Sequence, residues 1–317
     1  MRALITGGTG FAGSYLADLL ADEGGEVFVF SCAEPSRWSP GIRHFTVDIR
    51  DPVAVRCVCE DTEPDEVYHL AAISSVAASR ANPRNTFDVN VGGTYNLLEA
   101  CRRLASRPRI LNVSTSQVYA PTAELRLRES CPVRPENPYA ATKAMAELLL
   151  WQYPRADRQQ IITARPFNHS GPGQTSDFVL SYLAQQVAQM ELGLCAPVLR
   201  VGDLNVERDF TDVRDVVKAY RILLQRGRGG ELYNVCSGTA YRLSSALELL
   251  RSLSSVSLRV EIDPDRLHPG EPQRLCGDPT KIAIDTGWRA TIPFETTVRD
   301  LLEYWRVRSR SETQVVH

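Results

Sequence analysis

Two side chains suited to proton transfer, Tyr139 and Lys143, lie four residues apart in the segment NPYAATKAMAELLLW. The apolar pattern predicts a helix over 139–151, and residues at this spacing share one helix face. A phenol with a pKa of about 10 exchanges protons poorly near neutral pH, but a neighbouring ammonium stabilises its phenolate. We therefore expect Lys143 to lower the pKa of Tyr139, which can then exchange a proton with a carbonyl or an alcohol.

A row of milder polar groups follows the apolar residues 110–111 in NVSTSQVYA, residues 112–120. Ser114, Thr115, Ser116 and Gln117 offer hydroxyls and an amide, but no carboxylate, thiol or imidazole. Hydroxyls can orient a carbonyl oxygen, whereas an amide has no usable basic lone pair near neutral pH. This row therefore suits a reaction that needs no strong base on carbon.

A glycine-rich turn stands at the start of the chain, in ALITGGTGFAG. Gly7, Gly10 and Gly13 come directly after a predicted buried strand, 2–6, and open a predicted amphipathic helix, 11–22. Glycine lets the backbone approach a pyrophosphate closely, and the free N–H groups and dipole of the helix start stabilise its charge. We expect a dinucleotide to bind here.

The end of the next strand, 26–30, bears on which dinucleotide binds. A carboxylate there favours the ribose hydroxyls of NAD, whereas an arginine accommodates the phosphate of NADP. The chain reads FVFSCAEPSRW, with Glu34 and Arg37 beyond Ser31. We expect NADP(H) in preference to NAD(H), with Ser31 and Arg37 near the ribose. Asp48 is expected at the adenine amino group, or else as a cap of the following helix.

The first half of the chain alternates short apolar runs with helical patterns, which is typical of βαβ units and a parallel sheet. We predict an α/β fold with a doubly wound parallel sheet, a Rossmann fold, and a smaller α/β substrate-binding domain. The predicted strands are 2–6, 26–30, 44–47, 66–70, 109–113 and 160–165, and the helices are 11–22, 52–61, 85–104 and 139–151.

The regular alternation of strand and helix patterns ends after Pro166, which predicts a domain boundary there. We expect a dinucleotide-binding domain over 1–166, with a return segment at about 203–236. The substrate domain is then 167–202 with 237–307, and 308–317 is a flexible tail. A ligand should lie in the crevice between the two domains.

Composition narrows the class of partner. Among 317 residues, 36 Lys and Arg face 38 Asp and Glu, without a basic block that would favour nucleic acid. No apolar run approaches the roughly 18 residues of a membrane span, and the start resembles no signal peptide, so we expect a cytoplasmic protein away from membranes. Cys57 and Cys59 are the only close pair among eight cysteines, so free thiols and no metal are expected.

These motifs together resemble a known family. GGTGFAG, HLAA at 69–72, Asn90 in VNVGGT, STSQVY, Tyr139 with Lys143, and RPFNHSGPGQ at 165–174 occur in the order found in extended short-chain dehydrogenase/reductases acting on nucleotide sugars. The resemblance covers nearly the whole chain. RPFNHSGPGQ, VGDLNVERDFTDVRDV at 201–216 and YNVCSG at 233–238 are similar to the branch that handles GDP-linked 6-deoxyhexoses.

The resemblance implies a GDP-linked deoxyhexose substrate and NAD(P)H-dependent reduction of the C4 ketone of GDP-4-keto-6-deoxy-D-mannose to GDP-D-rhamnose. It also implies a homodimer, in which helices 85–104 and 139–151 form a four-helix interface. By position, Thr115 would bind the C4 oxygen, Tyr139 would donate the proton, and Lys143 would bind the nicotinamide ribose and tune the tyrosine.

Further contacts follow from the same resemblance. The residues expected at the cofactor are Gly7, Thr9, Gly10, Phe11, Ser31, Arg37, Asp48, Ile49, Leu70, Ala71, Ala72, Asn90, Val113, Tyr139, Lys143 and Pro166. The residues expected at the substrate are Ser74, Thr115, Ser116, Gln117, Asn168, Val179, Arg208, Arg266 and Glu271. Arg208 could instead form a surface ion pair with Asp209 or Asp212. The family often has arginine at the position of His268, so nucleotide anchoring there could pass to Arg266.

Three other functions remain open. A GDP-mannose 4,6-dehydratase needs a carboxylate to remove the C5 proton, and the family's glutamate is replaced here by Gln117, which disfavours elimination. A nucleotide-sugar 4-epimerase could use the same Thr115, Tyr139 and Lys143 with a retained NAD. A non-catalytic NADP-sensing protein is disfavoured by the intact tyrosine and lysine.

Overall fold

The computed structural model describes residues 1–33, 41–122, 124–153, 155–158, 160–267 and 272–315. Four positions of interest, Glu34, Arg37, His268 and Glu271, lie outside the described residues. Within the described part of the chain, no helix is both long enough and apolar enough to cross a membrane.

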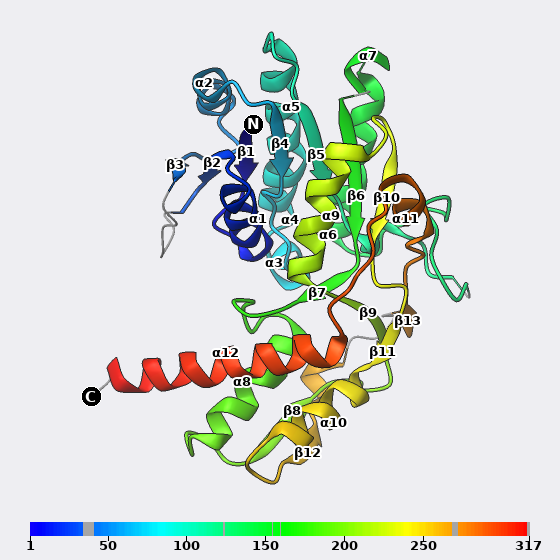
Figure 1. The fold of residues 1–317 in the computed structure, drawn as a ribbon. Coiled ribbons are helices and arrows are strands. Elements are labelled where there is room, and N and C mark those ends of the chain that lie inside the picture. Colours follow the sequence, from blue (N-terminus) through cyan, green and yellow to red (C-terminus); the bar gives the residue numbers. More distant parts are fainter. Residues whose placement is uncertain (34–40, 123, 154, 159, 268–271, 316–317) are drawn as a thin grey trace.

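A seven-stranded sheet forms the larger half of the molecule (Figure 1). Its order is β10-β6-β5-β4-β1-β2-β3, and every neighbouring pair is parallel. The strands are β1 (Arg2–Thr6), β2 (Glu26–Ser31), β3 (Ile42–Thr46), β4 (Glu66–His69), β5 (Arg109–Val113), β6 (Ile161–Pro166) and β10 (Leu232–Val235). This order confirms the predicted doubly wound sheet, whose direction of winding reverses between β1 and β4.

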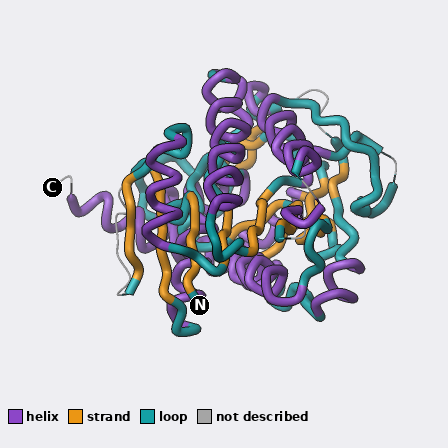
Figure 2. Tube along the Cα trace, turned by 90° about the horizontal axis from the view of Figure 1, so that it is seen from above, coloured by secondary structure: helices purple, strands orange, loops and turns teal. Residues whose placement is uncertain are grey.

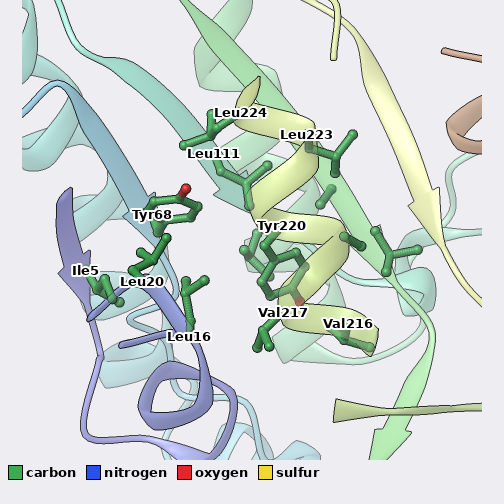
Figure 3. Close-up of a cluster of buried hydrophobic side chains, with 14 of the residues drawn as sticks. Ile5, Leu16, Leu20, Tyr68, Leu111, Val216, Val217, Tyr220, Leu223 and Leu224 are labelled. Carbon is green, nitrogen blue, oxygen red and sulfur yellow. The ribbon is translucent and has the colours of Figure 1, made fainter. Parts of the chain in front are cut away.

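Helices cover both faces of this sheet (Figures 1 and 2). Alternate strand residues point to opposite faces, so Ala3 and Ile5 join one core and Leu4 the other. The first core includes α1 (Phe11–Asp22) and α9 (Val213–Arg226), which meet the strands in Figure 3. The second core includes α2 (Pro52–Thr62) and α5 (Gly93–Arg103).

The predicted helix 85–104 is interrupted in the structure. It consists of α4 (Pro83–Phe87), a π-helical turn η1 (Asp88–Gly92) and α5. Asn90 lies in the π turn, where its side chain bonds to the backbone of Ile73. Single π turns inside helices are frequent at functional sites. A regular apolar period carries no signal for such a turn, so the sequence pattern does not predict it.

The catalytic helix agrees closely with its prediction. α6 (Pro138–Leu149) continues into a 3₁₀ turn, η3 (Leu150–Gln152). Asn137 caps its start by accepting a hydrogen bond from the N–H of Ala140, and Pro138 occupies the first helical position. Both features are favoured at helix starts. The cap fixes where the helix begins, one residue before Tyr139.

The smaller half contains two short sheets and three longer helices (Figure 1). In the four-stranded sheet, β9 (Glu207–Asp212) pairs with β7 (Asn168–Ser170), β11 (Ala240–Arg242) and β13 (Arg274–Leu275), and elsewhere β8 (Val198–Val201) pairs with β12 (Arg259–Ile262). The longer helices are α8 (Val179–Glu191), α10 (Leu243–Leu253) and α12 (Phe294–Val315), which share a core. Short helices are α3 (Val76–Ala81), α7 (Arg155–Arg158) and α11 (Thr280–Thr286).

The chain crosses between the halves more than once. α9 and β10 pack with the larger sheet, whereas β9, just before them, pairs in the smaller one. The segment expected to be a flexible tail is instead helical as far as Val315, because α12 continues through it. An ion pair between Arg308 and Glu312, four residues apart, supports this last part of α12. The domain boundaries themselves stay a prediction.

Candidate active site

The glycine-rich turn has the close packing expected of a phosphate site. Gly7 has a φ of 68°, and a Cβ there would lie 2.8 Å from the backbone N and Cα of Ala71. A Cβ on Gly13 would collide with the carbonyl oxygen of Gly7. Gly10 precedes α1, and no described side chain caps this helix start. Its N–H groups and dipole therefore suit a diphosphate.

The residues expected to contact the cofactor lie along one edge of the large sheet. Ser31, Val113 and Pro166 end β2, β5 and β6, and Leu70 follows the end of β4. Because all these strands are parallel, their carboxyl ends share this edge. The hydroxyl of Ser31 is already engaged, since it donates to the carbonyl of Ala33 (2.6 Å) and lies 2.9 Å from Nε2 of His44.

Asp48 does not cap the helix that follows it. Asp51 is the cap of α2, accepting hydrogen bonds from the N–H groups of Val53 and Ala54. Asp48 instead binds the guanidinium of Arg50, which lowers the pKa of its carboxyl. The capping alternative for Asp48 is therefore wrong, and its adenine contact stays a prediction.

Tyr139 is buried at the start of α6, with the side chain of Thr115 near its hydroxyl. Burial raises the pKa of Tyr139 to about 12, and the nearby side chain of Thr115 only partly offsets this. The groups that shift this pKa do not include Lys143, so its expected effect on the phenolate stays a prediction. Desolvation of the phenolate outweighs any charge effect, so the phenol is protonated at neutral pH.

Lys143 is also buried, and its ammonium donates to the carbonyl of Val113 at the end of β5 (2.7 Å). Burial lowers the pKa of Lys143 to about 8, while the negative charge of Glu147 acts in the opposite direction. Glu147 in turn binds Arg165 through two hydrogen bonds, of 2.9 and 2.5 Å. The lysine is thus held as a cation below about pH 8, in a fixed place beside the strand end.

Gln117 presents a donor to the site rather than a base. Asn137 uses its Oδ1 to cap α6, so its Nδ2 donates to Oε1 of Gln117 (3.0 Å). Because the amide oxygen of Gln117 is used in this way, its NH₂ remains as a hydrogen-bond donor. Ser116 beside it is buried, whereas Ser74, also expected at the substrate, is exposed in the loop after β4.

A cavity of about 630 Å³ opens in the smaller half. Four of the expected substrate residues line it, namely Asn168, Val179, Arg208 and Arg266. They come from β7, α8, β9 and the turn after β12. The cavity is large enough for a nucleotide and carries two arginines, which suits a diphosphate.

The two arginines are held differently. Arg208 is buried, and its guanidinium donates to the carbonyl of Glu207. The carboxylates considered as its surface partners act elsewhere: Asp209 accepts from Ser237, and Asp212 binds Arg214. The surface ion-pair alternative for Arg208 is therefore wrong. Arg266 is half-exposed, stacks on the ring of Tyr182 with 3.8 Å to the centroid, and pairs with Asp263.

Comparisons with known proteins show which family this chain belongs to. The profile of the family described as GDP-mannose 4,6 dehydratase matches residues 4–301. The chain belongs to this family. It is 36% identical to the GDP-6-deoxy-D-mannose reductase of Pseudomonas aeruginosa over 313 residues, covering 98% of this chain and 99% of the relative.

Solved structures agree with this family membership. The chain resembles RMD from P. aeruginosa complexed with NADPH, with a TM-score of 0.84 and 34% identity over 97% of this chain and 100% of the other. It also resembles the UDP-glucose 4-epimerase of Thermus thermophilus in complex with NAD, with a TM-score of 0.85 and 31% identity over 96% and 99%.

Several residues of the cavity were not found from the sequence. Tyr182, Asp203, Asp263 and Asp265 all line it. Asp203 lies in a stretch already assigned to the nucleotide-sugar resemblance, but Asp263 and Asp265 sit in a proline-rich loop whose composition carries no binding signal. The described residues contain no group of three or more His, Cys, Asp and Glu arranged to hold a metal. Cys57 is exposed and Cys59 buried, as expected for helix residues two apart.

Proposed function

We propose that this protein reduces the C4 ketone of GDP-4-keto-6-deoxy-D-mannose to GDP-D-rhamnose, using NADPH or NADH. The observation that carries the proposal is the amide of Gln117, which lies two residues after Thr115 and accepts from Asn137 through its Oε1, at a position where elimination would need a carboxylate. The similarity to a GDP-6-deoxy-D-mannose reductase over nearly the whole chain supports the same reaction.

The residues present fit a dinucleotide. A Cβ at Gly7 or Gly13 would fill the turn. Because glycine has no side chain, the backbone there stays open to a diphosphate. When bound, the reduced nicotinamide supplies a hydride to the ketone carbon. We place the adenosine and diphosphate along Gly7, Thr9, Gly10 and Phe11, with Asp48, Ile49, Leu70, Ala71, Ala72 and Asn90 around them. The choice of NADP(H) over NAD(H) rests on Ser31 and on Arg37, which lies outside the described residues.

The protein's own groups can complete a carbonyl reduction. The hydroxyl of Thr115 would hydrogen-bond to the ketone oxygen and orient it beside Tyr139. The phenol, which its raised pKa keeps protonated, would donate its proton to that oxygen as the C4–H bond forms. The alkoxide that is protonated is a much stronger base than a phenolate, so a pKa of about 12 does not prevent the transfer. The ammonium of Lys143 would stabilise the phenolate left behind.

The test supplies the purified protein with GDP-4-keto-6-deoxymannose and either NADPH or NADH and follows absorbance at 340 nm. We expect stoichiometric oxidation of one or both cofactors, and nuclear magnetic resonance of the product gives the configuration at C4. No loss of absorbance with either cofactor would contradict the proposal. Conversion of GDP-mannose to the keto sugar with NADP⁺ would identify a dehydratase instead.

A 4-epimerase is the second candidate, because the chain is 31% identical to the T. thermophilus UDP-glucose 4-epimerase at nearly full coverage. An epimerase returns the hydride it removes, so it would interconvert UDP-glucose and UDP-galactose without net change at 340 nm. A thermal-shift panel of GDP-, UDP-, dTDP- and CDP-sugars separates the two, because selective binding stabilises the folded state. We expect the GDP-sugar to give the largest shift.

We further propose that two copies form a dimer in the cytoplasm. The neighbouring helices α4, α5 and α6, with η3, expose five large apolar side chains, Phe87, Tyr95, Met145, Leu148 and Trp151. Trp151 is 70% exposed and Leu148 66%, which is costly for an isolated surface. A two-fold partner presenting the same helices would cover them in a four-helix interface. Light scattering should give twice the chain mass, and Leu148→Glu should give the single mass.

A further inference from the structure

A network of buried hydrogen bonds, joined through the backbone and the side chain of Asn90, runs from β1 to α6. Its members are Thr6, His69, Thr94, Asn90 and Thr142, each at most 4% exposed. They come from β1, β4, α5, the π turn η1 and α6. His69 stands in the middle, and neither the cofactor nor the substrate assignments above give it a role.

The direction of each bond at His69 is fixed by its neighbours. The carbonyl of Asn90 can only accept, so the hydroxyl of Thr94 donates to it (2.6 Å). Thr94 must then accept from Nε2–H of His69 (2.8 Å). In a neutral ring with its proton on Nε2, Nδ1 accepts, so the hydroxyl of Thr6 donates to it (2.8 Å). Thr6 is free to do so, because its oxygen accepts from the N–H of Ala71 (3.0 Å).

The chain continues from Asn90 to the backbone of Tyr139. The N–H of Ile73 donates to Oδ1 of Asn90 (2.8 Å), which fixes the orientation of the amide. Nδ2 therefore donates to the hydroxyl of Thr142 (3.0 Å), and Thr142 donates to the carbonyl of Tyr139 (2.8 Å). The hydrogen bonds thus form two aligned runs, one ending at the carbonyl of Asn90 and one beginning at its side-chain amide, and the bonds within each run strengthen one another.

The two ends of this hydrogen-bond network lie at the two places that must be aligned for the reaction. Thr6 directly precedes Gly7, whose turn leaves no room for a side chain against Ala71. At the other end stands Tyr139, whose phenol transfers the proton. We infer that His69 is a positioning residue, which holds the phosphate turn after β1 and the start of α6 at a fixed separation. The inference rests on the proposed reductase activity only for its kinetic readout.

A protonated ring would break this arrangement. Nδ1–H would then meet the hydroxyl of Thr6, whose own proton would lose its acceptor. Burial and the positive charge of Lys143 both lower the pKa of His69, to about 3, which agrees with a ring kept neutral. The chain thus needs histidine as a neutral donor and acceptor, with one nitrogen for each neighbour.

The test removes one link without touching cofactor or substrate. Thr94→Val keeps the shape of the side chain but loses its hydroxyl, whereas Thr94→Ser keeps the hydroxyl. Thr62→Val is the matched control, since Thr62 is a fully buried threonine at the end of α2 whose hydroxyl also bonds to a helix carbonyl. His69→Leu is the direct variant, and the threonine variants decide the question if it does not fold.

We expect Thr94→Val to lower kcat about tenfold or more with KM for NADPH changed less than about threefold, because small displacements at a reacting centre cost rate. Amide hydrogen exchange should become faster in residues 70–74 and 138–143, and Thr94→Ser and Thr62→Val should leave both readouts near wild type. Unchanged exchange in Thr94→Val, or an unchanged kcat, overturns the inference. If the wild-type protein does not reduce the GDP-sugar, the proposed function fails and hydrogen exchange alone decides the role of His69.

Discussion

The site around Tyr139 and the cavity in the smaller half are built in different ways. Thr115, Tyr139 and Lys143 are all buried, and the Thr115 hydroxyl and the Lys143 ammonium each have a hydrogen-bond partner within the protein. In the cavity, Arg208 is buried but Arg266 and Asp265 are exposed, and the lining comes from strands, helices and loops scattered between residues 168 and 266.

This difference separates rate from affinity. Groups that are already desolvated and oriented lose little when the transition state forms, so they act mainly on the rate of the chemical step. Exposed side chains must be ordered and dehydrated by the ligand, so each contributes a modest, separable part of its affinity. The predictions below test whether the two regions keep these separate roles.

Tyr139→Phe should give the largest effect. Without its proton donor, the protein should lose about 10³-fold in kcat, while NADPH affinity, measured by fluorescence titration, stays within about threefold. Tyr68→Phe is the matched control, because it removes the hydroxyl of a buried tyrosine that bonds to Glu66, away from the carboxyl edge of the sheet. Equal rates for Tyr139→Phe and wild type would remove the distinction between the regions.

Arg208→Met should act on affinity instead. In the proposed complex Arg208 donates to the diphosphate, and loss of this charge-assisted hydrogen bond predicts a rise in KM for the GDP-sugar of roughly 30-fold, with kcat nearly unchanged. Arg200→Met, which removes an exposed charge from β8 in the same half, should leave both parameters near wild type. Steady-state kinetics of the three proteins give the comparison, and a fall in kcat alone for Arg208→Met would contradict it.

The pH dependence should reveal the catalytic centre without any mutation. The pKa of Lys143 is lowered to about 8, and its charged form is the one that stabilises the phenolate. As pH rises through about 8 the ammonium is lost, so kcat/KM should be flat below that pH and fall about tenfold per pH unit above it. Circular dichroism at each pH checks that the fold persists, and a profile that stays flat to about pH 10 would exclude this role for Lys143.

Arg266→Lys should have the smallest effect. It keeps the charge but removes the flat guanidinium stacked on Tyr182, so KM for the GDP-sugar should rise only about threefold. Isothermal titration with GDP measures the same change without turnover. If KM for the GDP-sugar rose as much in Arg266→Lys as in Arg208→Met, the exposed side of the cavity would be as well ordered as its buried side.

Much of the larger half was predictable because local patterns determine it. β1, α1 and β5 have the predicted bounds, since each combines an apolar period with a clear start and stop. Tyr139 and Lys143 were found because a four-residue spacing places them on one helix face. The π turn at Asn90 and the pairing of Asn137 with Gln117 were not found, because they depend on contacts between segments distant in the chain.

The sequence by itself determined the parallel sheet, the phosphate turn and the catalytic pair, because periodicity, glycine placement and helical spacing act over a few residues. Only the tertiary structure decided the protonation of these groups. Burial raises the pKa of Tyr139 and lowers that of Lys143, and His69 is held neutral between two threonines. Desolvation and hydrogen-bond direction depend on every segment packed around a group, and no local pattern contains that information.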